Sequence, residues 1–141
     1  MIDLEKIKTR ASEIRGNLFR VRKYASLPDD EFWADERNIL SVKQLLLESI
    51  EACGNICVHI SAKRIFKAAS SFAECFEILA GAKVVGPKLA ERLSAMARFR
   101  NLLVHRYWDV TEAKILAYAR GNLSDFEDFL EAVLSFVEKS D

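Results

Sequence analysis

The chain has 141 residues, with 21 basic and 21 acidic side chains and a formal net charge of zero. This length suits one domain and is short for two, so we predict a single domain over residues 1–141. Half of the residues are hydrophobic, with only five glycines and two prolines, which excludes a disordered chain and argues against a turn-rich β protein. Zero net charge excludes nucleic-acid binding by overall attraction.

The three cysteines are odd in number, and each lies in an apolar helical run (Cys53, Cys57, Cys75). This pattern does not suit a disulfide framework, so we expect buried free thiols in a reducing, cytoplasmic protein. No run approaches the roughly 18 apolar residues of a membrane span, and we expect no membrane association.

Helical periodicity appears first in the N-terminal part of the chain. Apolar residues at i, i+3 and i+4 spacing predict a basic helix over 4–24. After Pro28 the pattern predicts an unusually long helix over 31–63, apolar on more than one side. Such a helix is usually covered on more than one side, and a second copy of this short chain is a candidate cover.

The same period continues to the C-terminus. We expect helices over 72–80, closed by Gly81 as a C-cap, and over 88–105. A short helix over 111–120 and a final helix starting at a capping box, 124–127, complete the chain. No strand-like alternation occurs. The prediction is an all-α, up-and-down bundle of four main helices plus short ones.

Residues 97–109, ARFRNLLVHRYWD, carry the most chemistry. From 92 to 108 the chain has His105 and four arginines but no acid: Arg92, Arg98, Arg100 and Arg106. Arg100 and Tyr107 share a helix face, whereas Arg100 and His105 lie about 140° apart around an ideal helix. Either the arginine curls around, or the helix loosens near its end, or a second chain completes the site.

Arg100 lies on an apolar face, where an unpaired charge is costly. A carboxylate partner is therefore a plain structural alternative for it, with Glu48, Glu51 and Glu74 as the candidates.

Arginine, histidine and tyrosine together suit phosphodiester chemistry. A guanidinium binds phosphate and stabilises transition-state charge, and His105 can exchange a proton with a ribose hydroxyl near neutral pH. The rings of Tyr107 and Trp108 can stack on unpaired bases. No carboxylate cluster accompanies His105, so we expect no metal site and no cofactor.

The run from Arg100 to Tyr107, RNLLVHRY, matches the R-x4-H-x-Y signature of HEPN domains. Its surroundings resemble the HepT-like branch of the HEPN superfamily over nearly the whole chain. The basic first helix, the long second helix containing LLESIEA (46–52), and Gly86–Pro87 before the motif helix all carry this resemblance.

The resemblance implies a HEPN-like homodimer that acts as a metal-independent endoribonuclease toxin on RNA. Its usual partner is an MNT-type nucleotidyltransferase antitoxin, which attaches AMP to the motif tyrosine. By position, Arg100 would bind phosphate, Asn101 would orient it, His105 would be the acid or base, and Tyr107 would be the modification target. Weaker RNA or phosphate contacts fall on Arg98, Arg106 and Trp108.

Two alternatives stay open. HEPN domains also serve as non-catalytic nucleotide- or substrate-binding partners of nucleotidyltransferases, and a single histidine per chain in the motif suits that role. The other is a structural dimer in which the arginines pair with acids across the interface.

Overall fold

The computed structural model describes residues 2–140, with the side chains of Tyr107 and Ser140 outside the described part. Its described residues form helices and no strands, which confirms the all-α prediction. The four long helices are α1 (Leu4–Ala25), α3 (Glu36–Ile60), α5 (Pro87–His105) and α7 (Ser124–Ser140). The shorter ones are α2 (Asp29–Ala34), α4 (Phe72–Gly81) and α6 (Glu112–Gly121). A π-helical turn (Ser61–Ile65) follows α3, and a 3₁₀ turn (Tyr107–Asp109) follows α5.

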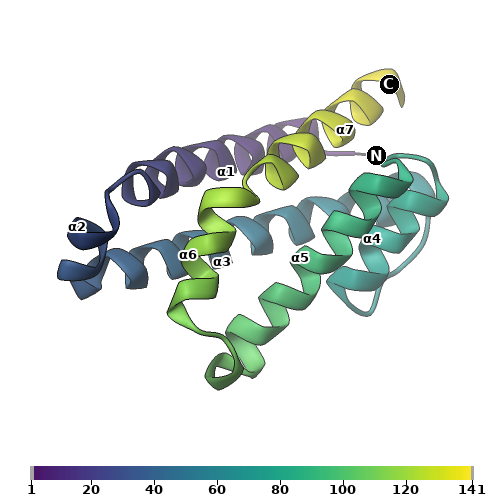
Figure 1. The fold of residues 1–141 in the computed structure, drawn as a ribbon. Coiled ribbons are helices and arrows are strands. Elements are labelled where there is room, and N and C mark those ends of the chain that lie inside the picture. Colours follow the sequence, from purple (N-terminus) through teal and green to yellow (C-terminus); the bar gives the residue numbers. More distant parts are fainter. Residues whose placement is uncertain (1, 141) are drawn as a thin grey trace.

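Helix α3 is the centre of the bundle. Figure 1 shows α1 lying along α3, with α2 at their shared end and α5 crossing the other side. Helices α4, α6 and α7 also contact α3. Much of the doubly apolar surface predicted for this helix is therefore covered by the same chain, although Leu40 and Val58 remain 58% and 41% exposed.

The segment Glu36–Ile65 is long and apolar enough to cross a membrane by length and composition alone, which the sequence analysis did not anticipate. Within the fold, 61% of its most apolar window is buried. A core helix of a soluble protein meets the same criterion, so packing accounts for the composition.

The prediction of one continuous helix over 31–63 is wrong near its start, because the chain breaks at Asp35 into two helices, α2 and α3. Asp35 is extended, with φ −125° and ψ 110°, and its carboxylate accepts the backbone N–H of Arg37 at 3.0 Å. It also forms an ion pair with the Arg37 guanidinium at 2.8 Å, and these hydrogen bonds lower the pKa of Asp35 to about 2. Asp35 is thus the N-cap of α3.

The expected glycine cap of α4 is also wrong. Gly81 is the last residue of α4, Ala82 is the C-cap, and the left-handed residue is Lys83 with φ 61°. Val84 then donates its N–H to the carbonyl of Leu79 at 2.9 Å. This is the closed C-terminal turn that a glycine often supplies, built here around a lysine.

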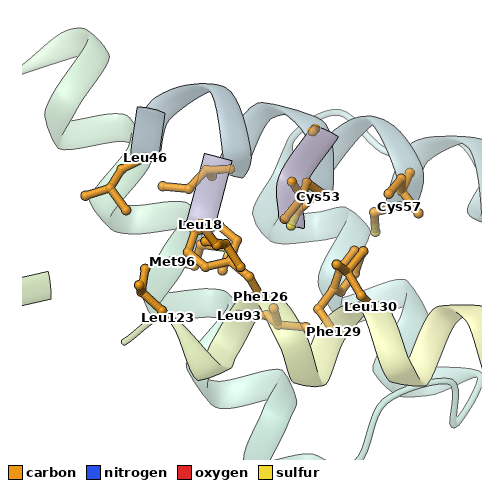
Figure 2. Packing of buried hydrophobic residues seen from close by; sticks show 14 of the residues in the cluster. Leu18, Leu46, Cys53, Cys57, Leu93, Met96, Leu123, Phe126, Phe129 and Leu130 are labelled. Atoms are coloured by element: carbon orange, nitrogen blue, oxygen red, sulfur yellow. The ribbon is translucent and has the colours of Figure 1, made fainter. Parts of the chain in front are cut away.

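Apolar side chains from all four long helices form the core. Figure 2 shows Phe126, Phe129 and Leu130 of α7 packed near Cys53 and Cys57 of α3. The three cysteines are free and buried, as predicted. Burial raises the pKa of the Cys53 thiol, so it stays a protonated apolar side chain.

Candidate functional site

An open cleft of about 470 Å³ lies between the start of α4 and the C-terminal half of α5. These two helices lie side by side in Figure 1. The cleft is lined by Ser70, Ser71, Phe72, Ala73, Arg100, Asn101 and His105. The three residues that were predicted to carry the chemistry are thus brought together by one chain.

Arg100 is held from two sides. Its Nε and Nη2 atoms donate to Glu51 Oε1 at 2.8 and 2.7 Å, and Nη1 donates to Asn101 Oδ1 at 3.2 Å. A guanidinium has five N–H donors, so these three contacts leave two for another acceptor. The structure selects Glu51 among the three candidate acids, and Arg100 keeps the donors that a phosphate needs.

The ring of Phe72 lies beneath this guanidinium, with Arg100 Cζ 5.2 Å from the ring centroid. The ring in turn lies against α3 at Gly54, where an added Cβ would be 2.4 Å from Phe72 Cζ. Gly54 therefore lets Phe72 approach the α3 backbone and support Arg100. Sequence reasoning missed both residues, although an isolated glycine inside a long apolar helix is a signal of close approach.

A serine pair forms the rim of the cleft. Ser71 Oγ accepts the backbone N–H of Glu74 at 3.1 Å, which caps α4. Ser70 Oγ donates to Glu74 Oε2 at 2.8 Å, and the Ser70 N–H lies 3.3 Å from Oε1. Glu74 is therefore engaged with the rim and not with Arg100. The Ser-x-x-Glu spacing was the signal that could have located this rim.

His105 is the last residue of α5, and its side chain is exposed. Arg106, the C-cap, has already left the helix with φ −139° and ψ 46°. Although Arg100 and His105 leave the helix in different directions, both reach the same cleft.

The weaker predicted contacts are more dispersed. Arg98 is exposed on α5 and does not line the cleft. Arg106 forms an ion pair with Asp109 at 2.6 Å, and Trp108 is 67% exposed three residues after His105. The side chain of Tyr107 lies outside the described residues.

Arg92 does not belong to the cleft. It donates to Asp125 at 2.8 Å and to Asp128 at 2.9 Å, which joins α5 to α7. The hydrogen bonds to Asp128 and Asp125 raise the pKa of Arg92. The acid-free stretch of the sequence is therefore less cationic in the fold, because Arg92 and Arg106 both meet carboxylates.

No three His, Cys, Asp or Glu side chains of the described residues gather where they could hold a metal ion. The second histidine, His59, is occupied elsewhere: its Nε2 accepts the backbone N–H of Asp3 at 3.0 Å.

A family model described as ribonuclease HepT-like matches residues 14–133. The chain belongs to the ribonuclease HepT-like family. A curated HepT-like relative, the mRNA nuclease HepT of Shewanella oneidensis, is 28% identical over 83 residues. That match covers 59% of this chain and 62% of the relative, so it spans less than two thirds of the relative's length.

Solved structures share the fold over nearly the whole chain. A tri-AMPylated HEPN toxin of Shewanella oneidensis, in complex with its MNT antitoxin, superposes with a TM-score of 0.84 at 24% identity, covering 96% of this chain and 99% of that one. A cytosolic protein of unknown function from Bacillus subtilis gives 0.83 at 20% identity, covering 99% and 93%. The HepT-like chain thus has the HEPN-type helical fold.

Proposed function

We propose that the protein is a metal-independent endoribonuclease toxin that cleaves RNA with Arg100, Asn101 and His105. One observation carries the proposal: the Arg100 guanidinium and the His105 imidazole line the same open cleft. Family membership and the name of the curated relative support the same chemistry.

In this mechanism Arg100 uses its two remaining donors to bind the scissile phosphate, and Asn101 orients it. The ribose O2′ attacks phosphorus, a P–O2′ bond forms, and the P–O5′ bond breaks. The 2′-hydroxyl proton is taken up by a base and a proton is delivered to the leaving O5′, with His105 serving one of these transfers. The products are a 2′,3′-cyclic phosphate and a free 5′-hydroxyl.

In an in-line displacement the attacking O2′ and the leaving O5′ lie on opposite sides of phosphorus, so one imidazole does not reach both oxygens. A homodimer that brings two His105 side chains to one RNA strand would supply both the acid and the base. We therefore include the homodimer in the proposal. The partner proposed is an MNT-type nucleotidyltransferase, with Tyr107 as the residue that it modifies with AMP. The tri-AMPylated toxin, solved in complex with its MNT antitoxin, supports the partner and the transfer of AMP, and the cytosolic neighbour supports a cytoplasmic location.

The test is a gel assay of the purified protein on unstructured RNA and on tRNA, with chelator present. The wild type is expected to cleave, and His105→Ala is expected to be inactive while it keeps the circular dichroism and the oligomeric state of the wild type. Undiminished cleavage by His105→Ala would remove His105 from the mechanism.

A second candidate is a non-catalytic HEPN module that binds a nucleotide or a substrate for a nucleotidyltransferase. It is favoured by the engagement of Arg100 with Glu51 and by the single histidine in the cleft. This alternative predicts binding of the transferase or nucleotide, but no RNA cut at any protein concentration. Intact-mass measurement showing unmodified Tyr107 would make that negative result decisive.

A further inference from the structure

The segment between α3 and α4 presents an aromatic ring to solvent. Phe66 is 84% exposed and follows the π-helical turn Ser61–Ile65. Its backbone is left-handed, with φ 61° and ψ 39°. Glycine and asparagine are the usual residues in this conformation, and a bulky aromatic residue is an outlier there.

A buried serine fixes this backbone. The carbonyl of Ser61 accepts the N–H of Phe66 and, at 3.0 Å, the N–H of Lys67. Ser61 Oγ donates to the carbonyl of Lys67 at 2.8 Å, and Ser61 itself is 1% exposed. The turn is therefore well held, yet the Phe66 ring contributes little packing to it. Since a glycine would fit this turn with less strain, the ring needs another explanation.

The charged residues next to Phe66 along the chain are all basic. Between Glu51 and Glu74 the sequence has no acid, and Lys63 and Lys67 are exposed on either side of Phe66. The motif stretch 92–108 is also free of acids. The two stretches meet at the cleft, to which the first contributes Ser70–Ala73 and the second Arg100, Asn101 and His105.

The chain also limits how far Phe66 lies from the cleft. Four peptide units separate it from Ser70 on the rim, so the two Cα atoms are at most about 14 Å apart. On the other side, Trp108 lies three residues after His105 and is 67% exposed. Each of the two chain segments that line the cleft thus has one exposed aromatic ring within four residues of its end, Phe66 before the first and Trp108 after the second.

We propose that Phe66 is a stacking platform for an unpaired RNA base next to the cleft, with Lys63 and Lys67 contacting the flanking phosphates. Base stacking on an aromatic face, combined with basic side chains along the backbone, is how proteins hold single-stranded RNA without reading its sequence. This inference rests on the proposed function, since it extends the RNA path beyond the reacting phosphate. It assigns the class of ligand as single-stranded RNA and not duplex.

The experiment measures binding of a fluorescent single-stranded oligoribonucleotide by anisotropy, in the His105→Ala background so that nothing is cleaved. Phe66→Leu keeps an apolar side chain and removes the aromatic face. It is expected to weaken binding about 5- to 150-fold, the range found for loss of one stacked base. Phe66→Trp should restore binding. Phe66→Gly, which removes the ring and suits the left-handed backbone, should weaken binding while leaving the melting temperature equal or higher.

Matched controls lie on other helices. Phe19 on α1 is also an exposed phenylalanine, 63% exposed, and Phe19→Leu should leave RNA affinity unchanged. Replacing Lys63 and Lys67 with glutamine should lower the magnitude of the slope of log K against log salt by about 1.4, since each phosphate contact on a single strand contributes about 0.7. The control pair, Lys8 and Lys139 replaced with glutamine, should leave the slope unchanged.

The outcomes separate this inference from the proposed function. If the wild type binds and cleaves RNA, and Phe66→Leu binds RNA as tightly as its parent, the stacking platform alone would be overturned. If Phe66→Leu kept its RNA affinity but lost binding to the antitoxin or to a second copy of the chain, Phe66 would be a protein contact. That result would also overturn the stacking platform. A protein that neither binds nor cuts RNA would overturn both.

Discussion

Gly54 and Phe72 lie in contact across the α3–α4 interface, and the aromatic ring occupies the space that a side chain at position 54 would fill. An added Cβ at Gly54 would come within 2.4 Å of Phe72 Cζ and 2.6 Å of Cδ1. The Arg100 guanidinium lies over the same ring, with Cζ 5.2 Å from the ring centroid. A backbone position on α3 therefore sets the position of a cleft residue on α5.

Gly54→Ala should consequently displace the Phe72 ring and, with it, Arg100. Overpacking of this kind destabilises by about 1–3 kcal/mol, partly offset by the better helix propensity of alanine. We expect a lower unfolding free energy in denaturant titration and slower RNA cleavage. The double variant Gly54→Ala/Phe72→Leu should recover stability but not cleavage.

The matched control is Gly16→Ala in α1, where an added Cβ meets nothing within 4 Å. This change should stabilise the protein by roughly 0.5–1 kcal/mol, because a glycine inside a helix is unfavourable. Equal effects at the two glycines would show that the contact with Phe72 is unimportant.

Arg100→Ala should reduce RNA cleavage by about 100-fold or more, the usual effect of removing one donor to a charged transition state. The Arg100 and Glu51 side chains are 23% and 36% exposed, so this ion pair is partly buried but still reached by water. Loss of stability should be about 1 kcal/mol or less. Activity assays and thermal denaturation measure the two effects separately.

Lys88→Ala, which removes an exposed cation from the first turn of the same helix, away from the cleft, is the control and should change neither quantity appreciably. A loss of the roughly 3–5 kcal/mol of a broken buried pair in Arg100→Ala would instead favour a purely structural role for Arg100.

Arg92→Ala should destabilise the bundle more than most surface changes, because it leaves the carboxylate of Asp125 without its partner. The Asp125 side chain is 5% exposed, whereas that of Asp128 is 45% exposed. We expect a loss of about 1–3 kcal/mol in chemical denaturation. Adding Asp125→Asn should recover part of this loss, since a buried amide is less costly than an unpaired carboxylate.

Arg22→Ala is the matched control for that prediction. Arg22 and Glu127 join α1 to α7 at 2.6 Å, but both side chains are about half exposed, so the loss should stay near 0–1 kcal/mol. If Arg92→Ala and Arg22→Ala lowered the unfolding free energy by the same amount, the burial of Asp125 would make no difference to the strength of its ion pair.

The helical order was predictable because it depends on local signals. The apolar period placed the four long helices, and Gly86–Pro87 marked the start of α5. The break at Asp35 was not predicted, since an acid followed by Glu36 and Arg37 also suits a helix interior. The left-handed turn at Lys83 was missed for a related reason: glycine is the usual signal for such turns, and the nearest one, Gly81, stays helical.

The cleft was only half predictable. Arg100, Asn101 and His105 belong to one motif and could be named from sequence, as could Glu51 as one of three possible partners. The opposite wall, Ser70–Ala73, comes from a segment about 30 residues earlier and contacts α5 only in the folded chain. No local sequence pattern predicts that Ser70–Ala73 packs against α5. This side of the cleft, and the support that Gly54 gives to Phe72, are therefore seen only in the structure.

His59 should make folding sensitive to mild acid. Burial and nearby Lys6 lower the pKa of His59 below its usual 6.5, and its neutral Nε2 accepts the N–H of Asp3 at the start of α1. A depressed pKa stabilises the fold fully above the unfolded value, and this contribution is lost as the pH falls through the folded value. Acidification from about pH 7.5 to about pH 5 should therefore lower the melting temperature.

His59→Gln should show a smaller melting-temperature change over the same interval, because an amide oxygen can accept the hydrogen bond without titrating. Proton NMR of the chain's two histidines gives the direct measurement, with the variant assigning the signals. A His59 resonance that titrates at or above 6.5 would contradict the prediction.

The burial of all three thiols makes it possible to label the cleft at one chosen position and to follow RNA binding there. Thiol reagents need an accessible sulfur, so the three native cysteines should not react with maleimide probes until the protein unfolds. A cysteine introduced at exposed Ser70 would then be the single labelled position, and a fluorophore there would report RNA entering the cleft without any native cysteine being replaced.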